Sequence, residues 1–320
     1  MMGFARIRQL LKIWMLPIAM LGGILFHNIM GYLSPLSPYL IAIMLFITYC
    51  RLAPKEIRFS RFSYLLLLIQ VAGSLAVYLL LLPFGSSIAE AGFICIFCPT
   101  ATAAPVITAM LGGSLSRLTS FSLLSNLTVA ILAPFLFTWM DSHGHSSSLS
   151  FFQITGLISG RVVPIILGPL VLSFLLRLIA PKIRDEIANH QSLSFYIWAV
   201  SLFIVVGNAV TYVMSHIGKP GAEANIMISI AGISLVACCL QFLIGRKLGK
   251  TVGDPISGAQ GLGQKNTVLA VWMSLSFLNP ISSVGPAAYV AWQNTINSLQ
   301  LWYKAKKDRN TVIGENPKSL

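Results

Sequence analysis

The sequence predicts an all-helical integral membrane protein with ten transmembrane helices. Hydrophobic residues make up 56% of the 320 residues and charged residues 10%, and the mean hydropathy is +0.79. This composition leaves too little polar surface for a soluble globule of this length. Apolar runs long enough to cross roughly 30 Å of hydrocarbon recur along the chain, and Lys and Arg concentrate in alternate connections between them.

The apolar runs define the predicted spans in order. They cover residues 13–33, 37–53, 63–84, 89–111, 118–139, 152–180, 193–215, 224–245, 254–280 and 285–303. The first run follows Lys12, has the length of a full span and lacks a cleavage site of small residues. We therefore interpret it as the first span and not as a signal peptide.

The basic residues set the orientation of these spans. All but three of the 22 Lys and Arg residues belong to the termini or to every second connection: Arg6, Arg8, Lys12, Arg51, Lys55, Arg58, Arg61, Arg117, Arg177, Lys182, Arg184, Arg246, Lys247, Lys250, Lys304, Lys306, Lys307, Arg309 and Lys318. The other connections contain only Lys219. Because cytoplasmic loops carry the positive excess, we predict a multi-pass protein of the plasma (inner) membrane with both termini in the cytoplasm. The lipid bilayer is then the main partner, and charges scattered over loops argue against nucleic acid.

Two spans are interrupted by polar residues, glycine and proline. The interruptions are Cys98–Pro105 in the fourth span and Gly258–Thr267 in the ninth. Unpaired backbone in hydrocarbon costs several kcal/mol per group unless protein or cavity water satisfies it, so an interrupted span needs a compensating use. Paired broken helices at matching places in two halves mark the midplane substrate site of secondary transporters. The plainer alternative is an ordinary kinked helix.

Ten spans divide into two repeats of five that enter the membrane from opposite sides. We place the first repeat at residues 1–145, the second at 146–305, and a basic cytoplasmic tail at 306–320. Glu90 precedes Thr102 by the same interval that separates Asp254 from Asn266. The sequence thus predicts inverted repeats with broken fourth and ninth helices.

Two basic residues, Arg161 and Lys265, fall inside predicted spans, whereas every acidic residue belongs to a loop or to the end of a span. Intramembrane charge is costly and by default functional. The countercharge of Lys265 is then a substrate, a helix C-terminal dipole or nothing, in which case the amine is neutral. Arg161 has the alternative of reaching the outer interface. Both charges, with converging helix N-termini, favour a small or amphipathic organic anion as the substrate.

Other kinds of site find little support. Cys95 and Cys98 have metal-motif spacing, but no second Cys or His pair accompanies them in the same half of the chain, so we predict no metal site. The spans lack paired acids and nucleophile motifs, so we predict no catalytic residues and no enzyme. An intramembrane enzyme and a membrane receptor that binds ligand without transporting it remain the alternatives from other functional classes.

The chain resembles the sodium/bile-acid symporter family. The resemblance rests on hydropathy over most of the chain and on four motifs: Cys98-Pro99 with Thr102, Gly263–Ala270, Asn279-Pro280 and Trp292–Asn294. It implies core and panel domains, crossed fourth and ninth helices, and alternating access by movement between the domains. It also implies substrate contacts at Thr102, Asn266, Thr267, Gln293 and Asn294, to which we add Arg161.

The chain departs from sodium-coupled relatives at their ion sites. In the ninth span, those relatives have Glu where this chain has Gly261 and a Gln-Asn pair where it has Lys265-Asn266. In the fourth span they have a Ser-Asn pair where this chain has Ala104-Pro105, and in the fifth they have hydroxyl residues at the positions of Leu118 and Ser122. Their Gln in the third span is matched to Tyr78 of this chain. We expect the ion-coupling positions at Lys265, Gln264 and Ser122, with the Lys265 ammonium replacing sodium. The predicted carrier needs no cofactor and works as a facilitator or by proton exchange on Lys265. The alternative is a sodium-coupled organic-anion or bile-acid symporter with remodelled ion sites.

Overall fold

The computed structural model describes Met15 and residues 18–52, 57–102, 104–141, 149–216 and 222–315. Within these ranges the chain is all-helical, and its one β-bridge joins Thr100 to Lys265. Five helical stretches are long and apolar enough to cross a membrane: His27–Cys50, Arg61–Phe84, Leu115–Met140, Phe151–Ile179 and Ala224–Lys250. The chain therefore has the helical, apolar architecture that the composition predicts.

Helices overlap each of the predicted spans. They are residues 18–25 with α2 (His27–Leu33), α3 (Ser37–Cys50), α4 (Arg61–Leu81), α5 (Ser86–Phe97) with α6 (Ala104–Leu111), α7 (Leu115–Asp141), α8 (Phe151–Ile179), α10 (Gln191–His216), α11 (Ala222–Lys250), α12 (Pro255–Gly263) with α13 (Thr267–Phe277), and α14 (Val284–Glu315). Short elements fill the connections: η1 (Ser34–Leu36), η3 (Leu82–Phe84), α9 (Pro181–Asn189) and η4 (Pro280–Ser283). The main departure is at the C-terminus, where α14 continues through the boundary expected at residue 305. The boundary expected at residues 145 and 146 lies outside the described residues.

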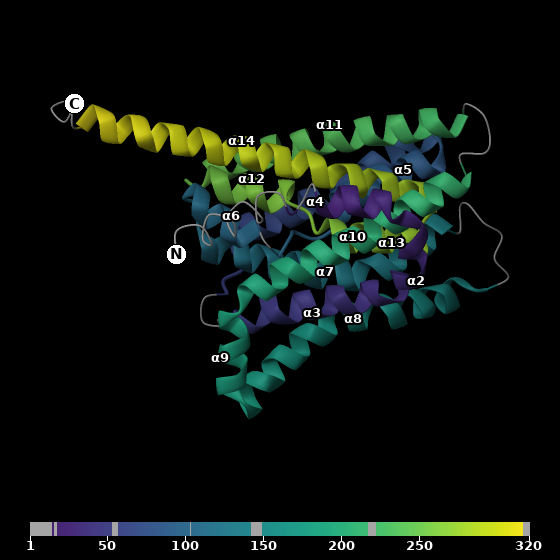
Figure 1. Ribbon diagram of the computed structural model, residues 1–320, viewed down its shortest axis with the longest axis horizontal. Coiled ribbons are helices and arrows are strands. Elements are labelled where there is room, and N and C mark those ends of the chain that lie inside the picture. Colours follow the sequence, from purple (N-terminus) through teal and green to yellow (C-terminus); the bar gives the residue numbers. More distant parts are fainter. Residues whose placement is uncertain are drawn as a thin grey trace.

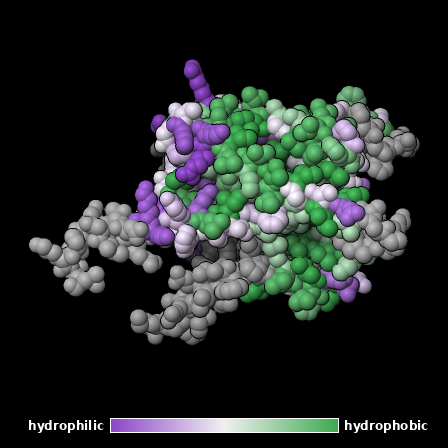
Figure 2. Space-filling view, turned by 90° about the horizontal axis from the view of Figure 1, so that it is seen from above, coloured by the Kyte–Doolittle hydropathy of each residue, from purple (hydrophilic) through white to green (hydrophobic). Residues whose placement is uncertain are grey.

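The helices lie side by side along the long axis of the molecule, and α9 crosses between α8 and α10 at one end (Figure 1). Their outer surface is apolar: Leu80, Phe152 and Ile228 are each at least 70% exposed. A broad hydrophobic band occupies the middle of the molecule, while hydrophilic side chains gather mainly toward the end where α14 terminates (Figure 2). Such a belt is suited to contact with lipid, because soluble proteins rarely expose so large an apolar surface to water.

The basic connections meet one another at that hydrophilic end. The Arg184 guanidinium donates to the carbonyl oxygen of Leu52 (2.8 Å), which joins α9 to the end of α3. Lys304 Nζ donates to the carbonyl oxygen of Met110 (2.9 Å), which joins α14 to the end of α6. Segments far apart in sequence therefore bring their positive charge to the same end of the bundle.

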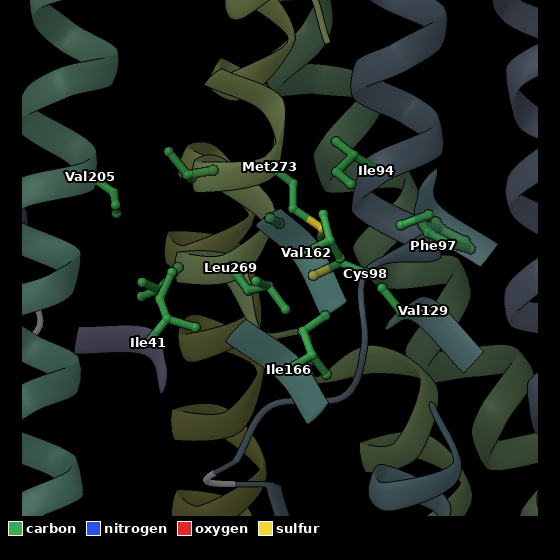
Figure 3. Close-up of a cluster of buried hydrophobic side chains, with 14 of the residues drawn as sticks. Ile41, Ile94, Phe97, Cys98, Val129, Val162, Ile166, Val205, Leu269 and Met273 are labelled. Carbon is green, nitrogen blue, oxygen red and sulfur yellow. The ribbon is translucent and has the colours of Figure 1, made fainter. Parts of the chain in front are cut away.

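The largest buried apolar cluster lies where α3, α8 and α10 face α5, α7 and α13. Figure 3 shows Ile41 of α3 and Val162 and Ile166 of α8 beside Leu269 and Met273 of α13. All five of these side chains are fully buried. The cluster holds the break between α5 and α6 against the neighbouring helices.

Candidate functional site

The two interrupted helices break at the same place and cross there. Between α5 and α6, and between α12 and α13, the chain is extended, and the two segments pair antiparallel. Ala101 N donates to Gln264 O (3.0 Å), and Asn266 N donates to Pro99 O (2.8 Å). Pro99 ends α5 because proline disfavours helix at the residue before it. The sequence prediction of two breaks is confirmed, and they form one site.

Side chains from other helices satisfy the last carbonyl groups of α5, which have no partner within the helix. Gln241 Nε2 of α11 donates to Cys95 O (3.2 Å), and Lys265 Nζ donates to Ile96 O (2.7 Å). Gln70 Nε2 of α4 donates to Phe97 O (2.7 Å). Each carbonyl that the break would leave orphaned in a dry interior therefore has a donor.

The end of α12 is closed in the same way by a side chain from the break between α5 and α6 and by one from α14. Thr100 Oγ1 donates to Gly261 O (2.9 Å). The hydroxyl of Tyr289, on α14, donates to Gly263 O (2.8 Å). The Gly261 and Gly263 carbonyl groups at the C-terminal end of α12 thus have side-chain donors at the crossing.

Lys265 lies in the middle of this arrangement and is 1% exposed. Its ammonium donates to a carbonyl at the C-terminal end of α5, where the helix dipole is negative. Among the partners that the sequence left open for the Lys265 amine, the one present in the structure is therefore the C-terminal end of a helix, α5. No described carboxylate forms an ion pair with Lys265.

The N-terminal end of α13 is different, because it keeps polar atoms without partners. Asn266 caps the helix through its Oδ1, which accepts from Leu269 N (3.2 Å). Its Nδ2 and the adjacent Thr267 Oγ1 are buried and have no hydrogen-bond partner. Buried polar atoms of this kind normally have a partner. Two of the predicted substrate residues therefore present unpartnered polar atoms at the start of α13.

Gln293 and Asn294 lie side by side on α14 but have different contacts. Gln293 clamps the break: its Oε1 accepts from Lys265 N (2.9 Å) and its Nε2 donates to Lys265 O (3.3 Å). Asn294 Nδ2 donates to Val290 O within its own helix (2.7 Å). Only Gln293 has hydrogen bonds to the crossing.

A small cavity of about 90 Å³ opens on the basic side of the crossing. Thr102, the first predicted substrate residue, lines it with Thr48 and Arg51 of α3 and with several residues of α7. A larger pocket of about 460 Å³ lies toward the other end of α3. It is lined by Arg161 of α8, Tyr39 of α3 and Trp272 of α13. Arg161 is therefore on a pocket wall and does not contact the crossing.

No protein-family model matches this chain, and no curated protein shows significant similarity to it.

The expected ion-coupling residues are only partly brought together. Gln264 is buried beside Lys265 within the break, and its carbonyl accepts the bond from Ala101. Ser122 lies on α7, where its own carbonyl accepts from Asn126 Nδ2 (2.7 Å). The α7 hydroxyl that bonds to the crossing is Ser125, whose Oγ accepts from Thr100 N (3.3 Å).

Gln70 is a site residue that the sequence reasoning missed. The resemblance matched the third-span glutamine to Tyr78, but Tyr78 packs against the rings of Phe93 and Trp139. Gln70 instead bonds to the end of α5 and accepts from Ser125 Oγ (2.8 Å). An isolated amide within an apolar span was the available signal, since such a group needs a buried partner.

Gly261, where the resemblance would place the Glu of sodium-coupled carriers, faces apolar side chains. A Cβ atom on it would lie 3.1 Å from Phe121 and 3.3 Å from both Leu118 and Leu66. The space that a carboxylate would need is therefore filled. Among the described residues, no group of three His, Cys, Asp or Glu side chains could hold a metal ion.

The two acidic residues at equivalent sequence positions make equivalent contacts. Glu90, near the start of α5, accepts from Asn279 N just beyond α13 (2.6 Å). Asp254, the N-cap of α12, accepts from Ser114 N just beyond α6 (3.3 Å). Each carboxylate thus ties the first half of one broken helix to the end of the second half of the other.

Proposed function

We propose that this chain is a secondary transporter of a small or amphipathic organic anion, in which the Lys265 ammonium stands in place of the coupling cation. The observation that carries the proposal is the buried crossing, where a fixed cation and the unpartnered start of α13 occur together. The proposal includes membership of the sodium/bile-acid symporter group, with sodium-independent transport as a facilitator or by proton exchange on Lys265.

The electrostatics of the crossing favour an anion. The N-terminus of α13 carries partial positive charge, and Asn266 Nδ2 and the Thr267 hydroxyl can both donate hydrogen bonds. Glu90 and Asp254 lie at the far ends of the half-helices and accept backbone N–H groups there. A carboxylate near the start of α13 would satisfy the two side chains and meet the field of Lys265.

The two pockets support alternating access. Tyr39 and Ala42 of α3 line the outer pocket, Leu45 belongs to the buried apolar cluster, and Arg51, just after α3, lines the inner pocket. Asn266 and Thr267 are closed off from solvent. Movement of α3 and α8 relative to the broken helices would open the start of α13 to either pocket in turn.

Two further observations support the finer parts of the proposal. The apolar surroundings of Gly261 leave no carboxylate ligand there for sodium, whose coordination normally relies on oxygen atoms. Glu90 near the start of the first broken helix contacts the chain just after the second, and Asp254 at the start of the second contacts the chain just after the first. Two inverted repeats would produce such a reciprocal pair of contacts. With the basic end of the bundle in the cytoplasm, the inner pocket would face the cell interior.

Uptake of a panel of labelled organic anions into proteoliposomes tests the proposal. Wild type is expected to transport at least one carboxylate without sodium. At a separation of about 7 Å and an effective dielectric constant near 20, an ammonium attracts an anion by roughly 2 kcal/mol. Lys265→Gln should therefore lower the uptake efficiency by about 30-fold. The control variant Lys247→Gln removes an exposed charge away from the crossing and should leave uptake unchanged.

The outcomes separate the alternatives. Strict sodium dependence that survives Lys265→Gln would contradict the proposal and favour a sodium-coupled symporter with remodelled ion sites. Binding of a labelled anion without counterflow would instead indicate a receptor.

A further inference from the structure

A further pocket, also of about 460 Å³, lies at the basic end of the bundle, away from the crossing. It is formed by α14 together with α11 and the inner ends of α6 and α12. Its lining residues are Leu111, Arg246, Ile256, Leu299, Gln300, Trp302, Tyr303, Lys304 and Lys307. The pocket therefore combines three basic side chains with an aromatic and aliphatic wall.

The described lining of this pocket is basic. No Asp or Glu is among the described residues that form it. Asp254, which is two residues from Ile256 in sequence, is not among the lining residues. Its carboxylate accepts a hydrogen bond from Ser114 N and lies 3.5 Å from the Arg117 guanidinium. Within the described part of the chain, the exposed Arg246 guanidinium has no hydrogen bond or ion pair. The pocket therefore favours a ligand with negative charge.

The apolar wall indicates where that ligand comes from. Trp302 and Tyr303 are 61% and 67% exposed, and Leu299 beside them is 60% exposed. Trp and Tyr next to Lys and Arg are typical of the membrane interface. The hydrophobic band and the hydrophilic end of the molecule meet at this end of the bundle (Figure 2). A purely water-soluble ligand would gain little from this wall.

We propose that this pocket binds the headgroup of an anionic phospholipid from the leaflet at the basic end of the bundle. The phosphate would lie among Arg246, Lys304 and Lys307, and the acyl chains would cover Leu299 and Trp302. Lys304 already bonds to Met110 O at the end of α6, so the bound lipid would join α14 to the inner halves of both broken helices. This site goes beyond the proposed transport function and does not depend on it.

Native mass spectrometry of the full chain in detergent micelles tests this inference. The probes are phosphatidylglycerol and phosphatidylcholine with identical acyl chains, and glycerol phosphate is a soluble competitor. Wild type should retain phosphatidylglycerol at least about tenfold more tightly than phosphatidylcholine. Arg246→Gln combined with Lys307→Gln should weaken phosphatidylglycerol binding by about 30-fold.

The matched control combines Lys247→Gln with Lys250→Gln. It also removes two positive charges, but from residues of α11 that do not line the pocket. It should change affinity by less than about twofold. If the first double variant is not recovered folded, Arg246→Gln alone should still weaken binding about fivefold. Equal retention by wild type and the pocket variant, or equal loss in the control, would overturn the inference. Displacement of the lipid by glycerol phosphate would overturn it in favour of a free phosphate ester.

Discussion

Substitution of Gln293 by Leu should weaken the fold at the crossing. The Gln293 amide makes two hydrogen bonds to the backbone of Lys265, at 2.9 and 3.3 Å. Leu has a similar size but leaves the buried Lys265 N–H without a partner, whereas the Lys265 carbonyl keeps the bond from Thr267 N (2.9 Å). A buried group left unsatisfied costs about 1–3 kcal/mol, whereas measured hydrogen bonds in a membrane protein average about 0.6 kcal/mol. We therefore expect a total loss of about 2 kcal/mol in the free energy of unfolding.

For a chain of this size such a loss corresponds to a melting temperature lower by roughly 4–8 °C. Gel filtration of detergent-solubilised protein after heating, with fluorescence detection, measures this shift. Asn294→Leu is the matched control, because the Asn294 amide bonds only to the carbonyl of Val290 four residues earlier. It should shift the melting temperature by less than about 2 °C. Equal shifts in the two variants, or no shift in Gln293→Leu, would refute the assignment of Gln293 as the clamp.

Three further predictions follow from close contacts and charge. Gly258→Ala would place a methyl group against a backbone carbonyl of α11 and should destabilise the protein by about 1–3 kcal/mol, whereas Gly232→Ala, which has open space, should be neutral in the same heating assay. Gly261→Glu should fail to create sodium-dependent uptake, because the new side chain would meet the Phe121 ring and bury a carboxylate among apolar groups; sodium-stimulated uptake by a stable variant would contradict this. Arg161→Gln should raise the KM for uptake from the outer side about fivefold with kcat nearly unchanged, and Arg161→Lys should restore it; an unchanged KM would mean that the outer pocket lies off the substrate path.

The sequence predicts the interruptions well because their causes are local. Pro99 disfavours helix at the residue before it, so the first break could be located from the sequence. The second break comes later than expected, because Gly258 and Gly261 lie within α12, which continues to Gly263. The partners of the break could not be predicted in this way. Gln70 and Tyr289 belong to helices whose rotation and register depend on packing across the whole bundle. The sequence shows that a lone amide in an apolar span needs a partner, but it does not show which carbonyl.

Lys265 illustrates how these local and long-range effects combine. A helix that ends in the middle of a membrane leaves carbonyl groups with no water to bind, and every such group needs a donor from elsewhere. At Cys95 and Phe97 the donors are neutral amides, whereas at Ile96 the donor is a primary amine. A neutral amide would satisfy that carbonyl equally well, so hydrogen bonding alone does not require a lysine there. The charge that an amine can carry is what distinguishes Lys265 from an amide at this place, and in the proposed transporter an anion at the adjacent start of α13 would account for that choice.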